Sequence, residues 1–248
     1  MGLLSKIFSK KAVLPPMDLG RLKADMHSHL IPGIDDGAET VEASIELIEA
    51  LHELGYTKLI TTPHIMSDYY KNDANIINEG LETMRAELIK RNIPVELDAA
   101  AEYYLDYEFE SKIDGKELMT FGDNYVLFEI SFINEPEQLD SVVFKMRTSG
   151  YTPVIAHVER YPYWYADPTQ YEKLVTMGVL LQLNISSLGG QYGPQTMKIG
   201  RQLIDNNMID LLGTDCHNMN YIEILRSALT DPHLHKVINS GKLLNAGL

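Results

Sequence analysis

Short apolar segments alternate with longer amphipathic segments along most of the chain. The short segments span five to seven residues and are bounded by polar or turn-forming positions, which is typical of buried strands. They are Leu22–His27, Lys58–Thr62, Val95–Ala101, Tyr125–Ile130, Pro153–His157, Val179–Ile185 and Ile209–Thr214. Strands that alternate with helices favour βα units in a parallel sheet. Seven such strands predict an α/β, TIM-barrel-like fold, or such a barrel with one unit missing.

The longer segments repeat apolar residues at spacings of three and four, which predicts helices. The clearest of these runs from Val41 to Leu54, and Gly55 follows as a stop signal. Similar patterns cover residues 74–91, 136–149, 168–177 and 195–207. The last segment, Tyr221–Leu248, has a helical pattern and then an irregular one, so we assign no helix boundaries there.

Composition excludes several classes of protein. The 248 residues include 35 acidic and 21 basic side chains, a net charge of −14 that repels nucleic acid. A single cysteine, Cys216, excludes an internal disulfide and suits a reducing compartment. No apolar run approaches the length of a membrane helix, which is about 18 residues. We therefore expect a cytoplasmic protein that does not bind nucleic acid.

The first 16 residues are expected to be separate from a single domain over residues 17–248. Within residues 1–11, apolar side chains alternate with Lys6, Lys10 and Lys11, and Pro15 and Pro16 then form a linker. The segment is either a basic chain terminus or a small amphipathic element that associates weakly with an anionic membrane surface.

Histidine and carboxylate residues gather at the ends of the predicted strands. The segments in question are Asp25-Met-His27-Ser-His29, Thr62-Pro-His64, Ala101-Glu102, Phe128-Glu129, Ala156-His157 and Gly213-Thr-Asp215-Cys-His217. A parallel barrel brings the ends of all its strands to one face, so these side chains should converge. Burying so many carboxylates and imidazoles without cations would be too costly. The pattern predicts a multinuclear metal centre, whereas His52, His233 and His235 are interpreted as structural residues.

The ligand types limit the metal and the substrate. Imidazoles with carboxylates suit Mn²⁺, Fe²⁺ or Zn²⁺, and the cations would attract an anionic substrate such as a phosphate monoester. Arg160 carries a planar fork suited to phosphate oxygens, although a surface ion pair with Glu159 or Asp167 is an equal alternative. Asp35 and Asp36 form a turn that also places a carboxylate within reach of a cation.

These segments, with His27-Ser-His29-Leu-Ile-Pro-Gly-Ile-Asp35-Asp36-Gly37 and His157-Val-Glu-Arg160-Tyr161, closely resemble the PHP (polymerase and histidinol phosphatase) superfamily. Within it, the chain is similar to the bacterial protein-tyrosine phosphatases of capsular and exopolysaccharide synthesis. The resemblance implies a distorted seven-stranded βα barrel with three divalent metals, often Mn²⁺. The implied ligands are His27, His29, Glu102 and Asp215 for the first metal, Glu102, Glu129 and His157 for the second, and Asp36, His64 and His217 for the third.

The resemblance further implies hydrolysis of phosphotyrosine by metal-activated hydroxide, with a bacterial tyrosine kinase as the partner and substrate. Arg160, Asp215 and His157 are the expected catalytic residues. The family often carries a second arginine after Asp215-Cys-His217, but here none precedes Arg226. A cysteine phosphatase is excluded because the sixth residue after Cys216 is Ile222 rather than arginine. The alternatives are a small-molecule phosphatase acting on histidinol phosphate and a non-catalytic, metal-stabilised partner of a tyrosine kinase.

Four aromatic residues, Tyr161, Tyr163, Trp164 and Tyr165, directly follow Arg160. We hypothesise that one or more of them, with Tyr161 and Trp164 foremost, frame the mouth of the site and bind the phosphotyrosine ring or the adjacent peptide. The alternative is that they pack over the barrel or form a subunit contact. No pattern in the chain predicts its oligomeric state.

Overall fold

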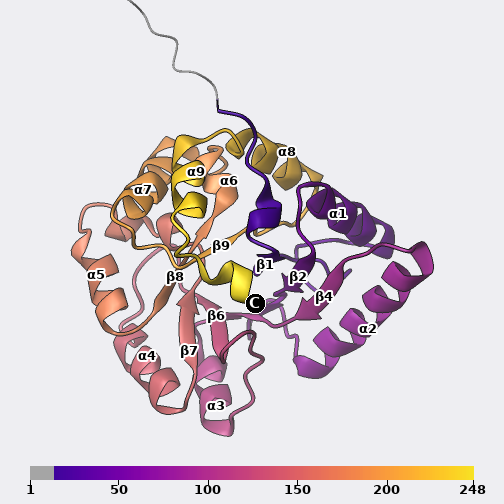
Figure 1. Cartoon of the computed structure of the whole chain (residues 1–248). Helices are drawn as coiled ribbons and strands as arrows, with labels where there is room; N and C mark the ends of the chain where they lie inside the picture. The colour runs from indigo at the N-terminus through magenta and orange to yellow at the C-terminus, as the bar shows by residue number, and fades with distance from the viewer. Residues whose placement is uncertain (1–13) are drawn as a thin grey trace, which may run out of the picture.

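The computed structural model describes residues 14–248, and parallel strands lie at its centre with helices around them (Figure 1). Two sheets form, in the orders β1-β2-β4 and β3-β5-β6-β7-β8-β9. Their strands are β1 Ala24–Asp25, β2 Lys58–Thr61, β3 His64–Ile65, β4 Glu96–Ala99, β5 Glu102–Tyr104, β6 Tyr125–Glu129, β7 Thr152–Ile155, β8 Leu180–Asn184 and β9 Leu211–Gly213. All pairs of neighbouring strands within the sheets are parallel.

Seven of the strands, β1, β2, β4, β6, β7, β8 and β9, overlap the seven that the sequence predicts. The short strands β3 and β5 were not predicted, because each begins after a break, just beyond the end of the second or third predicted strand. Pro63 lies at the first break and has no N–H to continue a ladder. The sheet curls round until Ser28, beyond β1, pairs in parallel with Cys216, beyond β9. The TIM-barrel-like α/β prediction is therefore confirmed.

The helices cover the outside of this curled sheet (Figure 1). They are α1 Val41–Glu53, α2 Ala74–Arg91, α3 Tyr107–Gly115, α4 Leu139–Thr148, α5 Thr169–Thr176, α6 Ile185–Leu188, α7 Gly193–Asp205, α8 Met219–Ala228 and α9 Pro232–Asn239. All five predicted helices are present, although the third, which is α4, begins at Leu139 rather than at residue 136. The sequence did not predict α3, whose only buried side chains are Phe109 and Ile113.

Two apolar cores hold the fold together. The larger one lies between the strands and the outer helices, and the smaller one combines side chains from several strands, including Met26, Leu127 and Leu211. The C-terminal 3-10 helix Leu244–Gly247 covers the smaller core, near the centre of the barrel in Figure 1. There the buried Asn245 side chain accepts from the amide of Leu212 and donates to its carbonyl and to that of Ala24, joining β1 to β9.

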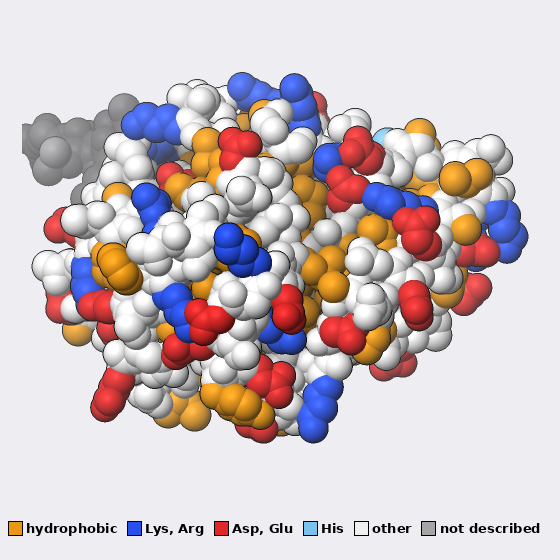
Figure 2. Space-filling view, turned by 90° about the horizontal axis from the view of Figure 1, so that it is seen from below, with side chains coloured by type: hydrophobic (Ala, Val, Ile, Leu, Met, Phe, Trp, Pro, Cys, Tyr) orange, Lys and Arg blue, Asp and Glu red, His pale blue; other side chains and the backbone are white. Residues whose placement is uncertain are grey.

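Both acidic and basic side chains are found on the surface. On the face shown in Figure 2, acidic and basic side chains are interspersed, with apolar side chains between them. Within residues 14–248, no helix combines the length and the apolar composition that a bilayer-spanning helix needs. The predicted membrane-surface association of residues 1–11 lies outside the described residues.

Candidate metal centre

The nine predicted ligands come from eight positions along the strands and one turn, and the fold brings them to one place. His27 and His29 follow β1, His64 and Glu102 begin β3 and β5, Glu129 ends β6, His157 follows β7, and Asp215 and His217 follow β9, while Asp36 lies in the turn before α1. Two of the nine, His157 and Asp215, have φ angles of 33° and 52°. Residues other than glycine rarely adopt this left-handed conformation, and functional sites are where such strain accumulates.

Four of these side chains form the first group. His27 Nε2 lies 3.2 Å from Glu102 Oε2 and 3.3 Å from Asp215 Oδ1. His29 Nε2 lies 3.5 Å from each of the same two oxygens. An ion bound about 2.1 Å from each of four tetrahedral ligands would separate them by about 3.4 Å. The spacing in this group therefore fits one cation at its centre.

The other two groups share His64. Its Nδ1 lies 3.3 Å from Glu102 Oε2 and 3.4 Å from Glu129 Oε1, and His157 Nε2 lies 3.0 Å from Glu102 Oε1. On its other side, His64 Nε2 is 3.5 Å from Asp36 Oδ1. His217 completes the third group, because its Nε2 is also 3.5 Å from Asp36 Oδ1. Glu102 thus joins the first two groups, and His64 joins the second to the third.

The chemistry of the cluster also fits divalent cations. His29 Nε2 and His64 Nδ1 are buried without a hydrogen-bond partner in the described part of the chain. The Glu102, Glu129 and Asp215 carboxyl groups are buried together. Burial and the neighbouring Glu102 carboxylate raise the pKa of Glu129 well above its usual range. Bound cations would supply both the missing partners and the missing positive charge.

Polar side chains on β8 form hydrogen bonds that orient the side chains of the first group. Gln182 Oε1 lies 3.0 Å from His27 Nδ1 and accepts from the His157 backbone amide at 2.8 Å. Its amide donates to Asn184 Oδ1, and Asn184 in turn donates to Asp215 Oδ2 at 2.6 Å. Partners of this kind fix the rings and carboxylates that bind metals. The sequence analysis missed both residues, although two polar residues at spacing two in an apolar strand are a signal.

The two aspartates of the first turn have different positions. Asp36 faces His64 and His217, whereas Asp35 Oδ2 lies 2.8 Å from His29 Nδ1 and accepts from the His64 amide at 3.1 Å. Asp35 therefore orients a ring of the first group. Gly37 is needed at the end of this turn, because a Cβ there would collide with the His29 carbonyl.

Arg160 points into the site and not toward the surface. Its NH1 lies 3.3 Å from Asp215 Oδ2, and its guanidinium carbon lies 4.0 Å above the Tyr192 ring and 4.6 Å above the Phe132 ring. Among the described residues, Arg160 forms no ion pair with Glu159 or Asp167. The surface ion pair considered as an alternative is thus not what the structure shows.

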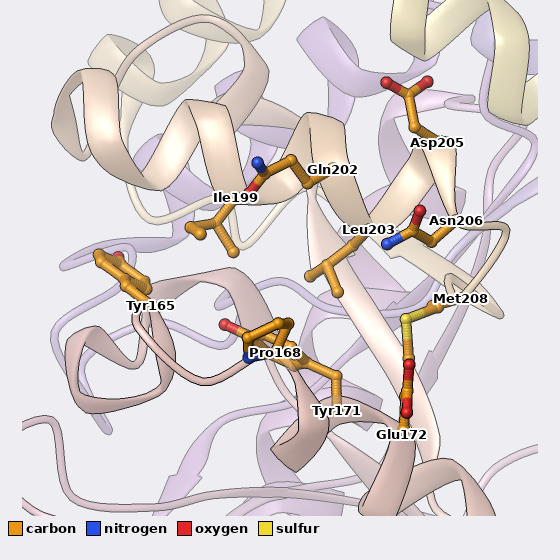
Figure 3. Close-up of a pocket in the computed structure, with 10 residues that line it drawn as sticks. All are labelled: Tyr165, Pro168, Tyr171, Glu172, Ile199, Gln202, Leu203, Asp205, Asn206 and Met208. Carbon is orange, nitrogen blue, oxygen red and sulfur yellow. The ribbon is translucent and has the colours of Figure 1, made fainter.

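Seven of the nine side chains line a cavity of about 200 Å³, and His27 and His29 are not part of its lining. Met66, Tyr70, Phe132 and Tyr221 also line it, and Arg160 is the one lysine or arginine among the described residues that do so. Arg226 lies elsewhere and bonds Glu53 at 3.1 Å. A second cavity, of about 450 Å³, lies between α5 and α7 (Figure 3), and its lining includes none of the nine predicted ligands.

The aromatic segment after Arg160 lies behind the cavity wall. Tyr161 is fully buried and Trp164 is 2% exposed, and neither lines the cavity. Direct contact of these two side chains with substrate does not fit this placement, because apolar packing takes both rings into the core. The rings that do line the cavity, Tyr70, Phe132 and Tyr221, are far apart in the sequence, so no local pattern could have found them.

Cys216 is not a nucleophile in this arrangement. Its side chain is 1% exposed, and burial raises the pKa of its thiol far above the ordinary value. A thiolate is what a cysteine phosphatase needs.

Comparison with known proteins identifies the family. The model of a family described as capsular polysaccharide synthesis, CpsB/CapC, matches residues 23–225. The chain belongs to the CpsB/CapC family. The tyrosine-protein phosphatase YwqE of Bacillus subtilis is 31% identical over 196 residues, which cover 79% of this chain and 77% of that protein. The putative tyrosine-protein phosphatase CapC of Staphylococcus aureus is 26% identical over the same shares of the two chains.

A solved structure supports the same assignment. It comes from work on YwqE of Bacillus subtilis and CpsB of Streptococcus pneumoniae, described as metal-dependent tyrosine phosphatases. The TM-score is 0.78 at 28% identity, with 90% of each chain covered. The predicted PHP-type, capsule-associated family is therefore confirmed, and the nine clustered side chains of this CpsB/CapC member lie within the matched region.

Proposed function

We propose that this CpsB/CapC protein is a metal-dependent protein-tyrosine phosphatase. The observation that carries the proposal is the cluster of nine histidine and carboxylate side chains, most of them buried, seven of which line one cavity together with Arg160. YwqE, CapC and CpsB carry tyrosine phosphatase names, which supports the same reaction. Divalent cations in the cluster would lower the pKa of water and neutralise phosphate charge.

Different side chains of this protein bind the phosphate and the cations. Arg160 binds phosphate oxygens with its planar fork, held in place by Asp215 and by the Phe132 and Tyr192 rings. His157 and Asp215 would hold cations, in separate groups joined by Glu102. Tyrosinate, with a pKa near 10, leaves readily, so the reaction asks little of a general acid and we assign none.

The proposal extends to the identity of the metals and of the physiological substrate. Three divalent ions, Mn²⁺ before Fe²⁺ or Zn²⁺, suit three groups built from imidazoles and carboxylates. The capsular family description and the relatives' names support a phosphotyrosine protein of capsular polysaccharide synthesis, with a bacterial tyrosine kinase as our candidate. We place the reaction in the cytoplasm, where such a kinase would expose its phosphotyrosines.

Turnover of a phosphotyrosine peptide by the Mn²⁺-loaded protein tests the proposal. We expect hydrolysis that chelation abolishes, and a loss of about a hundredfold or more for Asp215→Asn and for His157→Ala. Cys216→Ser, which changes a buried thiol outside the cluster, is the matched control and should keep its activity. Turnover of histidinol phosphate in preference to the peptide, or activity that resists chelation, would contradict the proposal.

A further inference from the structure

The loop of residues 131–135, between β6 and α4, presents apolar side chains at the edge of the cavity. Phe132 lines the cavity and is 38% exposed, and Ile133 beside it is 90% exposed. We name these five residues the Phe132 loop. Large apolar side chains next to a catalytic cavity mark a surface that contacts another molecule.

Phe132 also forms part of the wall around the reactive groups. One contact is to the Arg160 guanidinium, at 4.6 Å, and another is to the His157 ring, with the ring centroids 5.5 Å apart. Phe132 stacks on the buried Tyr161 ring as well, again at 5.5 Å. The loop therefore lies directly against the groups that would bind phosphate and metal.

The aromatic segment after Arg160 holds this loop in position. The Tyr161 hydroxyl accepts from the Ile130 amide, just before the loop, and donates to the Ala156 carbonyl, just before His157. Tyr163 donates its hydroxyl hydrogen to the Ser131 carbonyl at 2.7 Å, and the Trp164 indole N–H donates to Glu135 Oε2. Both ends of the loop are thus held by hydrogen bonds from the aromatic segment, with Phe132 against the cavity and Ile133 exposed to solvent.

The size of the cavity determines which part of a polypeptide substrate lies outside it, next to the loop. A volume of about 200 Å³ is below the roughly 300 Å³ at which small-molecule pockets begin. It accommodates the phosphate and ring of one phosphotyrosine but not the neighbouring residues of a polypeptide. Those neighbours have to lie outside, against the rim to which the Phe132 loop belongs.

We propose that the Phe132 loop is the polypeptide-recognition surface of this phosphatase, and that Ile133 contacts an apolar side chain next to the phosphotyrosine. This inference rests on the proposed function. Tyr161, Tyr163 and Trp164 are positioning residues for the loop. The specificity for peptides over free aryl phosphates then comes from the loop, and the aromatic segment acts through it.

Ile133→Ser tests the surface role without disturbing the core, because the side chain is exposed. The measurement is kcat/KM for a phosphotyrosine peptide with leucine on both sides, divided by kcat/KM for p-nitrophenyl phosphate, on the Mn²⁺-loaded protein. We expect this ratio to fall about fivefold or more, through a higher KM for the peptide. Ile89→Ser is the control: Ile89 is 78% exposed at the end of α2 and should leave the ratio unchanged.

Trp164→Phe tests the support, since it keeps a ring in the core and removes the hydrogen bond to Glu135. The expected result is a higher peptide KM with kcat retained. A ratio for Ile133→Ser equal to that for Ile89→Ser would overturn the loop proposal alone. A wild-type protein without phosphotyrosine-peptide activity would overturn the proposed function and the loop proposal together.

Discussion

At the scale of single residues, Arg160 carries the positive charge that the chain itself contributes to the cavity. Two rings and one carboxylate hold its guanidinium: Tyr192 at 4.0 Å, Phe132 at 4.6 Å and Asp215 Oδ2 at 3.3 Å. Burial opposes the charged form, but attraction to the neighbouring Asp215 carboxylate raises the pKa of Arg160 above its ordinary value. The group is therefore always charged and already oriented before a phosphate arrives.

Two substitutions of Arg160 distinguish the contribution of its charge from that of its planar guanidinium. Arg160→Lys keeps the charge but loses the planar fork and the stacking on two rings, so we expect a cost of about 1–3 kcal/mol in kcat/KM for a phosphotyrosine peptide. Arg160→Ala should cost at least as much. Steady-state kinetics on the Mn²⁺-loaded protein gives both values, with Arg226→Lys as the control because Arg226 bonds Glu53 away from the cavity. Unchanged kinetics in Arg160→Ala would remove this residue from the site.

At the scale of elements, strand β8 contributes no predicted ligand and yet connects two of the metal groups. Gln182 contacts both the His27 ring and the His157 amide, and its own amide reaches Asn184, which bonds Asp215. All of these side chains are buried, so water cannot replace a lost partner easily. The strand therefore aligns ligands that come from β1, β7 and β9.

Gln182→Leu should weaken metal binding while preserving the fold. The leucine is of similar size but leaves His27 Nδ1 and the His157 amide without partners, so we expect about a 10-fold to 100-fold loss in Mn²⁺ affinity. Calorimetric titration of the metal-free protein with Mn²⁺ gives the dissociation constant without relying on activity. Gln202→Leu, at an exposed position of α7, is the control. Equal affinities for the two variants would show that β8 does not orient the ligands.

The same elements show what sequence patterns can predict. Eight of the nine clustered side chains are predictable because they lie at the ends of predicted strands, which a parallel barrel brings together, whereas Asp36 lies in a turn. Helix α3 has only two buried residues, so its spacing of apolar residues is too weak to predict a helix. The roles of Phe132 and Trp164 depend on contacts between loops that are distant in the sequence, and an aromatic residue in isolation indicates packing and binding equally well.

At the scale of the whole molecule, the acidic balance and the buried cluster act together on stability. The chain carries a net charge of −14, and three of its carboxylates, Glu102, Glu129 and Asp215, are buried side by side. Closing the barrel brings them together, since Glu102 and Glu129 lie on adjacent strands β5 and β6 and Asp215 follows β9. The fold thus stores repulsion that bound cations would relieve.

Metal removal should therefore lower the melting temperature. A ligand present at about a hundred times its Kd stabilises the folded state by about 2.7 kcal/mol, which for a chain of this size corresponds to about 5–10 °C. Thermal unfolding of the chelated protein with and without added Mn²⁺ measures the shift. Glu129→Gln is the informative variant: it removes a buried carboxyl group whose raised pKa disfavours folding at neutral pH, so the metal-free protein should become more stable, and its gain from Mn²⁺ should fall because one ligand is weakened. A wild-type melting temperature that does not respond to Mn²⁺, Fe²⁺ or Zn²⁺ would show that the cluster is a hydrogen-bonded network and not a metal site.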